Sequence, residues 1–297
     1  MNFFKSLFGK KEEEAPEKKQ QEEAARNFDV LKYDGVRALR SGETAYAIEC
    51  FNHALELHDD LEVRDYLSQA LIRNNELLPA YEQLQKLQEA EPDNLKVLLR
   101  MADVTYMMED YGTMASVCEK ALLLDKDNPE TLYYYARACL GQDDQVNAIA
   151  MLTKAIAVKD DFADARLLCG ETLLKMNDKE GAAEDVDWLL AHTHDNEDVL
   201  QLDAALETAK GNVQKAIDVY THIIDLNPFS LKAFRERGAL WLKLGDKESA
   251  EEDMKSVLEL DPNQAKQVSG NYSAEGTEDI GRQVEQAYRN NNPLGLG

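Results

Sequence analysis

The sequence contains little proline and no long apolar run. Seven prolines are spread over 297 residues, and β-branched residues do not gather into the runs that build sheets. This composition favours helix over strand. No apolar stretch approaches the roughly 18 residues that a membrane-spanning helix needs. The apolar part of the N-terminal stretch MNFFKSLFGKK is too short for a signal-peptide core, and no small-residue cleavage site follows it.

Cysteine is also scarce. The four cysteines, Cys50, Cys118, Cys139 and Cys169, show no CxxC or other metal-ligand spacing. None of them lies in the Gly- and Pro-rich framework of a disulfide-stabilised domain. We therefore expect reduced thiols in a cytosol-like compartment, which predicts a cytoplasmic protein.

Basic residues are few compared with acidic ones. The chain has 33 Lys and Arg against 57 Asp and Glu, which gives a formal net charge of −24. Residues 1–26 are neutral overall and residues 263–297 are nearly so, so the excess lies in the body of the chain. Such a body repels phosphate backbones, and nucleic-acid binding is therefore not expected. Solubility is the simplest reason for the acidity.

Catalytic and cofactor-binding motifs are missing. The sequence has no GxGxxG, GxxxxGK[ST], GxSxG or HExxH. Its one histidine cluster, HTHDNED at His192 to Asp198, lies in a turn, where solvated polar residues are usual. Carboxylates are abundant, but nothing identifies the partly desolvated pocket that a general acid or base needs. We expect no metal, no cofactor and no enzymatic activity.

A period of about 34 residues runs through the chain instead. The stretches GNVQKAIDVYTHIIDLNPF and GDKESAEEDMKSVLELDPN share one layout and begin at Gly211 and Gly245. Apolar or small residues recur at this interval, and a second small residue comes 12 positions before each of them. The recurring residues are Ala47, Ala80, Met114, Ala148, Ala182, Ala216 and Ala250, preceded by Gly35, Ser68, Ala102, Ala136, Gly170, Ala204 and Gly238.

The residues that follow each recurring position are apolar as well. Four residues on stand Phe51, Leu84, Cys118, Leu152, Val186, Tyr220 and Met254, and seven on stand Ala54, Leu87, Ala121, Ala155, Leu189, Ile223 and Val257. This pattern predicts two helices per unit, separated by a polar turn that contains Gly or Asn. The small residues let the two helices approach closely, and neighbouring units must stack to bury their apolar faces.

In this pattern the sequence resembles the tetratricopeptide repeat family. The stretch RGALWLKLGDKESAEEDMKSVLELDP matches best, with Gly238, Trp241, Gly245, Ala250, Val257 and Pro262 in place. Seven units cover roughly residues 28–262. The resemblance implies an all-α fold, a right-handed α-solenoid superhelix of about seven helical hairpins. The chain departs from the family pattern where Arg64 and Arg166 replace an aromatic or Leu, where Met114 replaces Ala, and where the terminal Pro is present only at Pro92, Pro228 and Pro262.

The resemblance also implies a function, which is to hold an extended peptide or a partner helix in a concave groove. In the family this groove is lined by repeat positions 2, 5, 9, 12 and 13 of the first helices. The corresponding and neighbouring residues are basic or aromatic to an unusual degree for so acidic a chain. They are Lys32, Arg40, Arg73, Lys96, Arg100, Asp103, Tyr106, Tyr133, Tyr134, Arg137, Leu167, Glu171, Lys175, Lys232, Arg235 and Lys243.

We therefore predict a non-enzymatic scaffold or adaptor that binds a protein or peptide, with an acidic or aromatic-containing segment as the best fit. The alternative for Tyr133, Tyr134 and Tyr135 is that at least one of these consecutive helix residues belongs to the core. The oligomeric state stays open.

One subtype of the family clamps the C-terminal carboxylate of chaperone tails with two Lys, two Asn and one Arg. Lys32, Lys96 and Arg100 match that pattern, but Val36 and Tyr66 occupy the two Asn positions. The polar side chains that would satisfy a bound carboxylate are therefore missing. The repeat register also places Cys118 and Cys169 on inward helix faces, where they are expected to act as small buried hydrophobes.

The two tails differ from the array. Residues 1–27 form a charged tail that we expect to be flexible, and its first residues carry Phe3, Phe4, Leu7 and Phe8 at helical spacing beside lysines. This FFKSLF segment could make a weak contact with a membrane surface or dock into a partner. The alternative function is accordingly a peripheral, membrane-recruited assembly factor or co-chaperone.

Residues 263–297 begin with a flexible break, SGNYSAEGT. Ile280, Val284 and Tyr288 then follow with i, i+4, i+8 spacing, which predicts a short amphipathic helix. Because helical arrays need a terminal cap, we expect residues 277–290 to fold back onto the seventh unit. An exposed docking motif is the alternative.

Overall fold

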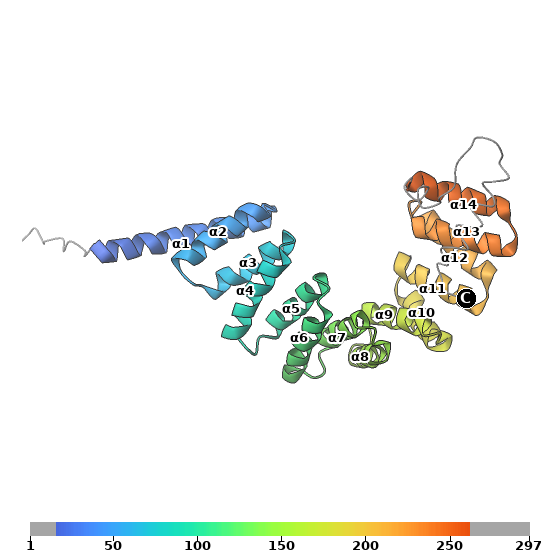
Figure 1. Cartoon of the computed structure of the whole chain (residues 1–297), viewed down its shortest axis with the longest axis horizontal. Coiled ribbons are helices and arrows are strands. Elements are labelled where there is room, and N and C mark those ends of the chain that lie inside the picture. The colour runs from blue at the N-terminus through green and yellow to red at the C-terminus, as the bar shows by residue number, and fades with distance from the viewer. Residues whose placement is uncertain (1–15, 262–297) are drawn as a thin grey trace, which may run out of the picture. The chain divides into compact units, whose positions relative to one another are not determined.

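The computed structural model describes residues 16–261, which form fourteen α-helices and no strand (Figure 1). Antiparallel neighbours pair into seven hairpins. In chain order the helices are α1 (Pro16–Ser41), α2 (Thr44–Leu57), α3 (Leu61–Arg73), α4 (Leu77–Ala90), α5 (Leu95–Met107), α6 (Tyr111–Leu124), α7 (Pro129–Gly141), α8 (Gln145–Val158), α9 (Ala163–Lys175), α10 (Lys179–His192), α11 (Glu197–Lys210), α12 (Val213–Leu226), α13 (Leu231–Leu244) and α14 (Lys247–Leu260).

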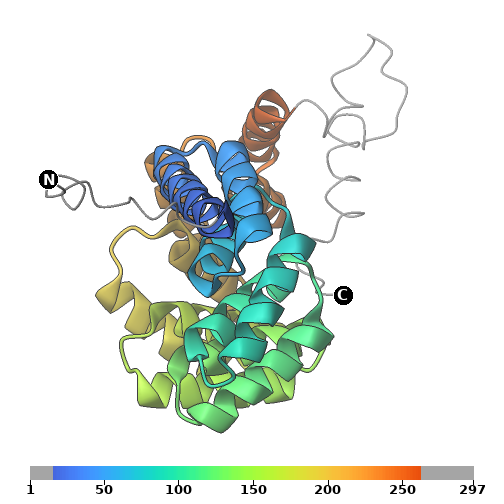
Figure 2. The ribbon, with the colours of Figure 1, turned by 90° about the vertical axis from the view of Figure 1, so that its left-hand side faces the viewer.

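The helices belong to two compact units that divide inside α8, the first ending at Met151 and the second beginning at Leu152. In unit 1, each helix from α1 to α7 contacts the next, and in unit 2 the same holds from α9 to α14. The first helices of successive hairpins also contact each other: α1 contacts α3, α5 contacts α7, and α9 contacts α11. Figure 2 shows the α1–α2 hairpin with its two helices side by side. Each unit is thus an all-α helical-repeat solenoid.

The turn inside each hairpin has the same backbone conformation. One residue in every turn has a positive φ, between 57° and 86°, and the seven residues are Gly42, Asn75, Glu109, Asp143, Asn177, Gly211 and Gly245. The next residue donates its N–H to a carbonyl five positions back, for example Asn212 to Glu207 at 2.8 Å. This is the bond pattern that ends an α-helix with a left-handed residue. The predicted Gly- or Asn-containing turns are confirmed, with Glu109 and Asp143 as the departures.

Short polar side chains begin many of the helices. Asp60, Asn94, Asn128 and Asn196 accept hydrogen bonds from the first turns of α3, α5, α7 and α11. Aspartates do the same for several second helices, as Asp110 does for α6 and Asp246 does for α14. These caps fix where each helix starts, because they satisfy N–H groups that have no partner within the helix.

The residues of the 34-residue period form the core, as predicted. All seven recurring residues, Met114 included, are 0% exposed. The small residues 12 positions earlier are buried as well. A β-carbon added to Gly35 would lie 2.6 Å from the ring of Phe51, so α1 and α2 can approach this closely only because that position has no side chain. Of the following apolar positions, Met254 alone is half-buried and the others are buried.

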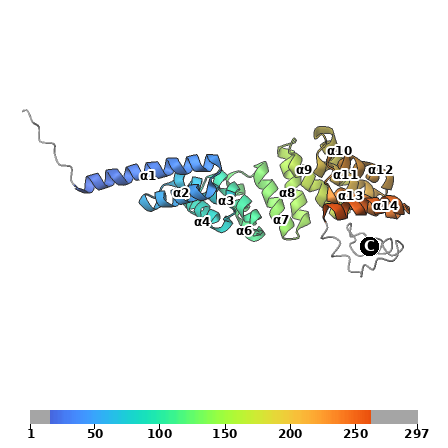
Figure 3. The same cartoon turned by 90° about the horizontal axis from the view of Figure 1, so that it is seen from above.

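The first helix starts earlier than the sequence analysis predicted. Residues 16–27 were expected to be part of a flexible tail, but α1 begins at Pro16 and continues without a break to Ser41. The segment KKQQEEAA consists of good helix formers, so the helix of the first hairpin propagates backwards through it. The first turns of α1 extend past α2 (Figures 1 and 3).

Several predictions fall outside the described residues. They concern Phe3, Phe4, Leu7 and Phe8, the proline at position 262, and the stripe at Ile280, Val284 and Tyr288. Within residues 16–261, no helix is both long enough and apolar enough to cross a membrane.

All four cysteines are buried free thiols, as predicted for Cys118 and Cys169. Burial raises the pKa of each of these two thiols to about 12. Both are therefore protonated at neutral pH, and a thiol in that state is a poor nucleophile.

Candidate functional site

The first helices of unit 1 bring most of the predicted binding residues onto one surface. We call this surface the unit-1 face and define it by the side chains at repeat positions 2, 5, 9, 12 and 13 of α1, α3, α5 and α7, together with the neighbouring Arg100 and Tyr134. Side-chain contacts connect each helix to the next one along this face. They run from Lys32 to Glu62, from Arg100 to Asp65, and from Tyr134 to Asp103.

The cations at the N-terminal end of the face are already engaged. Lys32 donates to Glu62 at 2.6 Å and to Asp60 at 3.4 Å, both at the start of α3. The hydrogen bond to Glu62 raises the pKa of Lys32, and the negative charge of Asp60 adds to the shift. Arg73 donates to the backbone oxygen of Leu39 at 3.1 Å. These two cations therefore connect the first two hairpins.

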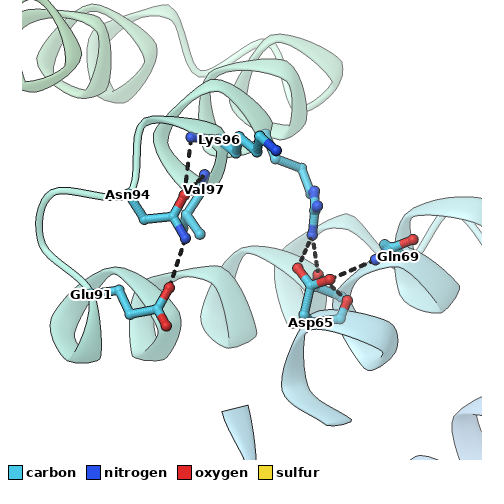
Figure 4. A network of polar contacts seen from close by, with 8 residues as sticks. Asp65, Gln69, Glu91, Asn94, Lys96 and Val97 are labelled. Carbon is cyan, nitrogen blue, oxygen red and sulfur yellow. Dashed lines mark hydrogen bonds and ion pairs between the residues drawn. The ribbon is translucent and has the colours of Figure 1, made fainter. Parts of the chain in front are cut away.

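Arg100 is engaged in the same way. Its guanidinium pairs with Asp65 on α3 and donates to the hydroxyl of Ser68 at 3.2 Å. Gln69 donates to the other oxygen of Asp65 at 2.7 Å, so that carboxylate is held from two sides (Figure 4). The side chain of Lys96, in contrast, is exposed, and its helix begins at the Asn94 cap shown in the same figure.

Arg137 on α7 has a different environment. The centre of its guanidinium lies 3.4 Å from the centroid of the Tyr106 ring and 5.5 Å from that of Tyr133. The two tyrosines approach the guanidinium from α5 and from its own helix. No carboxylate between residues 23 and 261 is found in an ion pair with Arg137, and the faces of the two aromatic rings stabilise its charge.

The three consecutive tyrosines of α7 divide between the core and the face. The rings of Tyr134 and Tyr135 pack against the core cluster around Met101 and Cys118. The Tyr134 hydroxyl still reaches the face, where it donates to Asp103 at 3.3 Å. Burial, helped by Asp103, raises the pKa of Tyr134 to about 12. Tyr133 is the tyrosine of this helix whose ring contacts Arg137. The ring of Tyr134 belongs to the core, and only its hydroxyl belongs to the unit-1 face.

A carboxylate clamp finds no support in this geometry. Two of its three matching cations, Lys32 and Arg100, are paired with carboxylates of the neighbouring helix. Tyr66, at an expected Asn position, stacks on Phe51 with ring centroids 5.8 Å apart and donates to Glu62. Its ring therefore belongs to the packing between α2 and α3.

In unit 2 the corresponding surface lies on α9, α11 and α13, and we call it the unit-2 face. Leu167 is half-buried against the neighbouring core cluster, Lys175 is exposed, and Arg235 pairs with Glu236 at 3.4 Å. No residue of α11 was among the predicted binding residues. The structure adds Gln201, which is only 7% exposed. Its place at repeat position 5, equivalent to Leu167 and Arg235, is the signal that could have identified it.

The histidine cluster at the end of α10 is arranged by packing. The ring of His192 stacks on Trp188 at 4.0 Å, and its Nδ1 lies 2.7 Å from the Trp188 carbonyl oxygen. Asp195 instead contacts His222 at 3.1 Å. Among the residues that the structure describes, no three His, Cys, Asp or Glu side chains gather into a ligand set for a metal ion.

Comparison with known proteins agrees with this architecture. The tetratricopeptide repeat family model matches residues 238–264. A tetratricopeptide repeat protein from Parabacteroides merdae aligns with a TM-score of 0.67 and 14% identity, covering 88% of this chain and 99% of that one. The pilF protein of Pseudomonas aeruginosa aligns with a TM-score of 0.57 and 18% identity, over 71% of this chain and 96% of that one.

A third structure, YrrB, is described as a TPR protein with an unusual peptide-binding site. It aligns with a TM-score of 0.51 and 15% identity, over 61% of this chain and 94% of that one. At these identities the likeness concerns the fold, which is typical of scaffolds that bind peptides or proteins. The chain therefore contains a sequence match to the tetratricopeptide repeat at residues 238–264, within a helical-repeat fold that it shares with tetratricopeptide repeat proteins.

Proposed function

We propose that this protein is a non-enzymatic scaffold that binds an acidic segment of a partner protein on the unit-1 face. Arg137 is the anchor of this interaction. The carboxylate of the ligand would accept from the guanidinium edge, while the Tyr106 and Tyr133 rings hold the guanidinium plane. Such a charge-assisted bond is stronger than a neutral one and depends on orientation.

The observation that carries the proposal is the contrast among the cations of this face. Lys32 and Arg100 each have a carboxylate partner within the fold, and Arg73 bonds a backbone oxygen. Arg137 has only aromatic partners among the described residues. The fold therefore supplies the positive charge at this point and leaves its neutralisation to a ligand.

The surroundings of Arg137 suit a binding hot spot. Tyr and Arg are the side chains most enriched in such spots, and here they come preassembled from two rigid helices. Preorganisation reduces the entropy that binding must overcome, because these side chains are already held in place. YrrB, a structural neighbour described as having an unusual peptide-binding site, supports a peptide as the kind of ligand.

Selection of peptides from a random displayed library by the full-length protein tests the proposal. We expect the selected peptides to be rich in Asp and Glu, and the Arg137→Gln substitution to weaken their binding roughly 30-fold, the loss typical of a hot spot of about 2 kcal/mol. Tyr106→Leu should weaken binding as well, because the guanidinium loses one of its two supporting rings.

The matched control is Arg37→Gln. Arg37 is an exposed arginine on α1 whose side chain pairs with Asp34 at 2.8 Å, so its loss should leave binding unchanged. Selected peptides without acidic residues would contradict the proposal. So would equal effects of the Arg37 and Arg137 substitutions.

A further inference from the structure

The C-terminal end of the array carries a charged surface. The exposed side chains of α14 include Glu251, Glu252, Lys255 and Glu259. None of the large hydrophobic side chains exposed between residues 23 and 261 belongs to this helix. A polar outer face is what a terminal repeat needs for solubility. The last helix therefore has little need of an additional apolar cap.

The unit-2 face offers a small, apolar surface. Leu167 and Leu174 contribute from α9, Ala205 from α11, and Ala239 and Leu242 from α13, and all five are half-buried. The two alanines lie at repeat position 9, where α5 and α7 have Asp103 and Arg137 and α9 has the half-buried Glu171. The short side chains of the alanines leave room for bulky apolar groups from another segment.

Two buried polar atoms on the same face have no hydrogen-bond partner within residues 23–261. Gln201 is 7% exposed, and its Oε1 accepts no hydrogen bond. The Nε of Arg235 is likewise buried without an acceptor. Burial of such atoms is unfavourable unless another polar group bonds to them. The face therefore lacks one donor and one acceptor, and a peptide segment can provide both.

These two atoms lie on connected helices. Glu197, at the start of α11, accepts from Ser230 at 2.6 Å and from Asn227 at 2.8 Å, both just before α13. Gln201 also bonds to Glu197, and this contact contributes to lowering the pKa of that carboxyl after the larger effects of Ser230 and Asn227. The amide of Gln201 is thus held from one side, with its oxygen left for a ligand.

The chain itself supplies a segment of suitable chemistry. Ile280, Val284 and Tyr288 form a stripe at helical spacing, with the amides of Gln283 and Gln286 between them. The stretch from residue 261 to residue 277 can span on the order of 50 Å when extended. That exceeds the roughly 20 Å length of a fourteen-residue helix, so the stripe can reach the unit-2 face of its own chain.

We propose that residues 277–290 bind as an amphipathic helix on the unit-2 face of the same molecule. Ile280, Val284 and Tyr288 pack over Ala205 and Ala239, and polar groups of the segment bond to Gln201 and Arg235. This arrangement is independent of binding to the unit-1 face.

Site-specific photo-cross-linking in the full-length protein tests this placement. A photoreactive residue at Ala205 should form a cross-link to residues 277–290, identified by mass spectrometry. The same residue at Gln214, which is exposed on α12, should not. In a mixture of isotopically light and heavy protein, the cross-linked peptides should carry a single label. Mixed labels would show a second copy on the face, and absence of the Ala205 cross-link would show no such contact; either result overturns the proposal.

Hydrogen exchange of the full-length protein gives a second readout. Substitution of Ile280 and Val284 by Asp should accelerate exchange of the amides of residues 277–290 at least about tenfold, because two buried apolar side chains are lost from the contact. Exchange in α14 should stay unchanged. Unchanged exchange in residues 277–290, or acceleration confined to α14, would contradict binding to the unit-2 face.

Discussion

A single backbone position recurs in the turn of every hairpin and requires a left-handed conformation. Three of the seven residues there are glycines, two are Asn and one is Asp, all of which adopt this conformation readily. Glu109, with φ of 57°, is the one that does not. The turn between α5 and α6 therefore contains local strain that the other six turns avoid.

Replacement of Glu109 by Gly should stabilise the protein. We expect the free energy of unfolding to rise by about 0.5–1 kcal/mol, since the relief of a strained φ exceeds the greater chain entropy of Gly in the unfolded state. Urea denaturation measures the change. Gly245→Ala, which introduces a side chain at φ of 85° in open space, should lower stability instead. A loss of stability in Glu109→Gly would show that this turn is not strained.

Glu236 on α13 contributes a pH dependence to stability. Its side chain is 6% exposed, and burial raises the pKa of this carboxyl even though the Arg235 guanidinium opposes the shift. A raised pKa in the fold means that the native state favours the protonated form. The stability that this group contributes is therefore present at acid pH and is lost as pH rises through its folded pKa.

In the Glu236→Gln variant, stability should not fall in this way as the pH rises. Its melting temperature should exceed that of the natural protein at pH 7, and the difference should shrink as the pH falls toward 4. Thermal denaturation across this range checks the expectation. Glu251→Gln, at an exposed position on α14, serves as the control and should show no comparable trend. A difference that grows with falling pH would contradict the sign of the shift.

At some positions two helices pack so closely that there is no room for a side chain. A β-carbon on Gly141, the last residue of α7, would lie 2.2 Å from the Tyr111 ring at the start of α6. Gly141→Ala should therefore destabilise the protein by roughly 1–3 kcal/mol, because α6 and α7 must separate or the ring must move.

The control for this packing is Gly112→Ala. A β-carbon at Gly112, also in α6, would have its nearest neighbour 3.8 Å away, so stability should stay the same or rise slightly. Chemical denaturation measures the stability of both variants. The comparison separates the steric clash at Gly141 from the general effect of adding a methyl group to a helix. Equal stability of the two variants would argue against close packing at Gly141.

The arrangement of helices could be predicted because the period fixes burial. A small residue such as Ala250 in every unit is useful only where two helices approach, and all seven of these residues are fully buried. The early start of α1 was missed because charged composition was taken as a sign of a linker. Lys, Glu, Gln and Ala are strong helix formers, and the helix that follows them in the chain can extend backwards through them.

The candidate site was predictable in part. Repeat position predicted Lys32 and Arg137 for one face, with Arg100 as a neighbouring residue, and in the structure these three residues lie on α1, α7 and α5 of unit 1. Their ion pairs could not be predicted from these positions alone, because Glu62 comes from the repeat after Lys32 and Asp65 from the repeat before Arg100, and pairing depends on side-chain geometry.

On the scale of the whole chain, the two units present faces of different chemistry. The unit-1 face carries Arg137 and its tyrosines among paired charges, whereas the unit-2 face carries Ala205 and Ala239 around a buried amide. A scaffold with two unlike surfaces can bind two unlike segments. We therefore assign the acidic partner to the first face and the chain's own C-terminal segment to the second.

A double-mutant cycle tests the central claim most directly. Binding of one selected acidic peptide, and of the same peptide with its Glu residues replaced by Gln, is measured by calorimetry for the natural protein and for Arg137→Gln. We predict a coupling energy of about 1.5 kcal/mol or more between Arg137 and the peptide carboxylates, in the range of close charge pairs at interfaces. A coupling energy near zero would show that Arg137 does not recognise an acidic ligand.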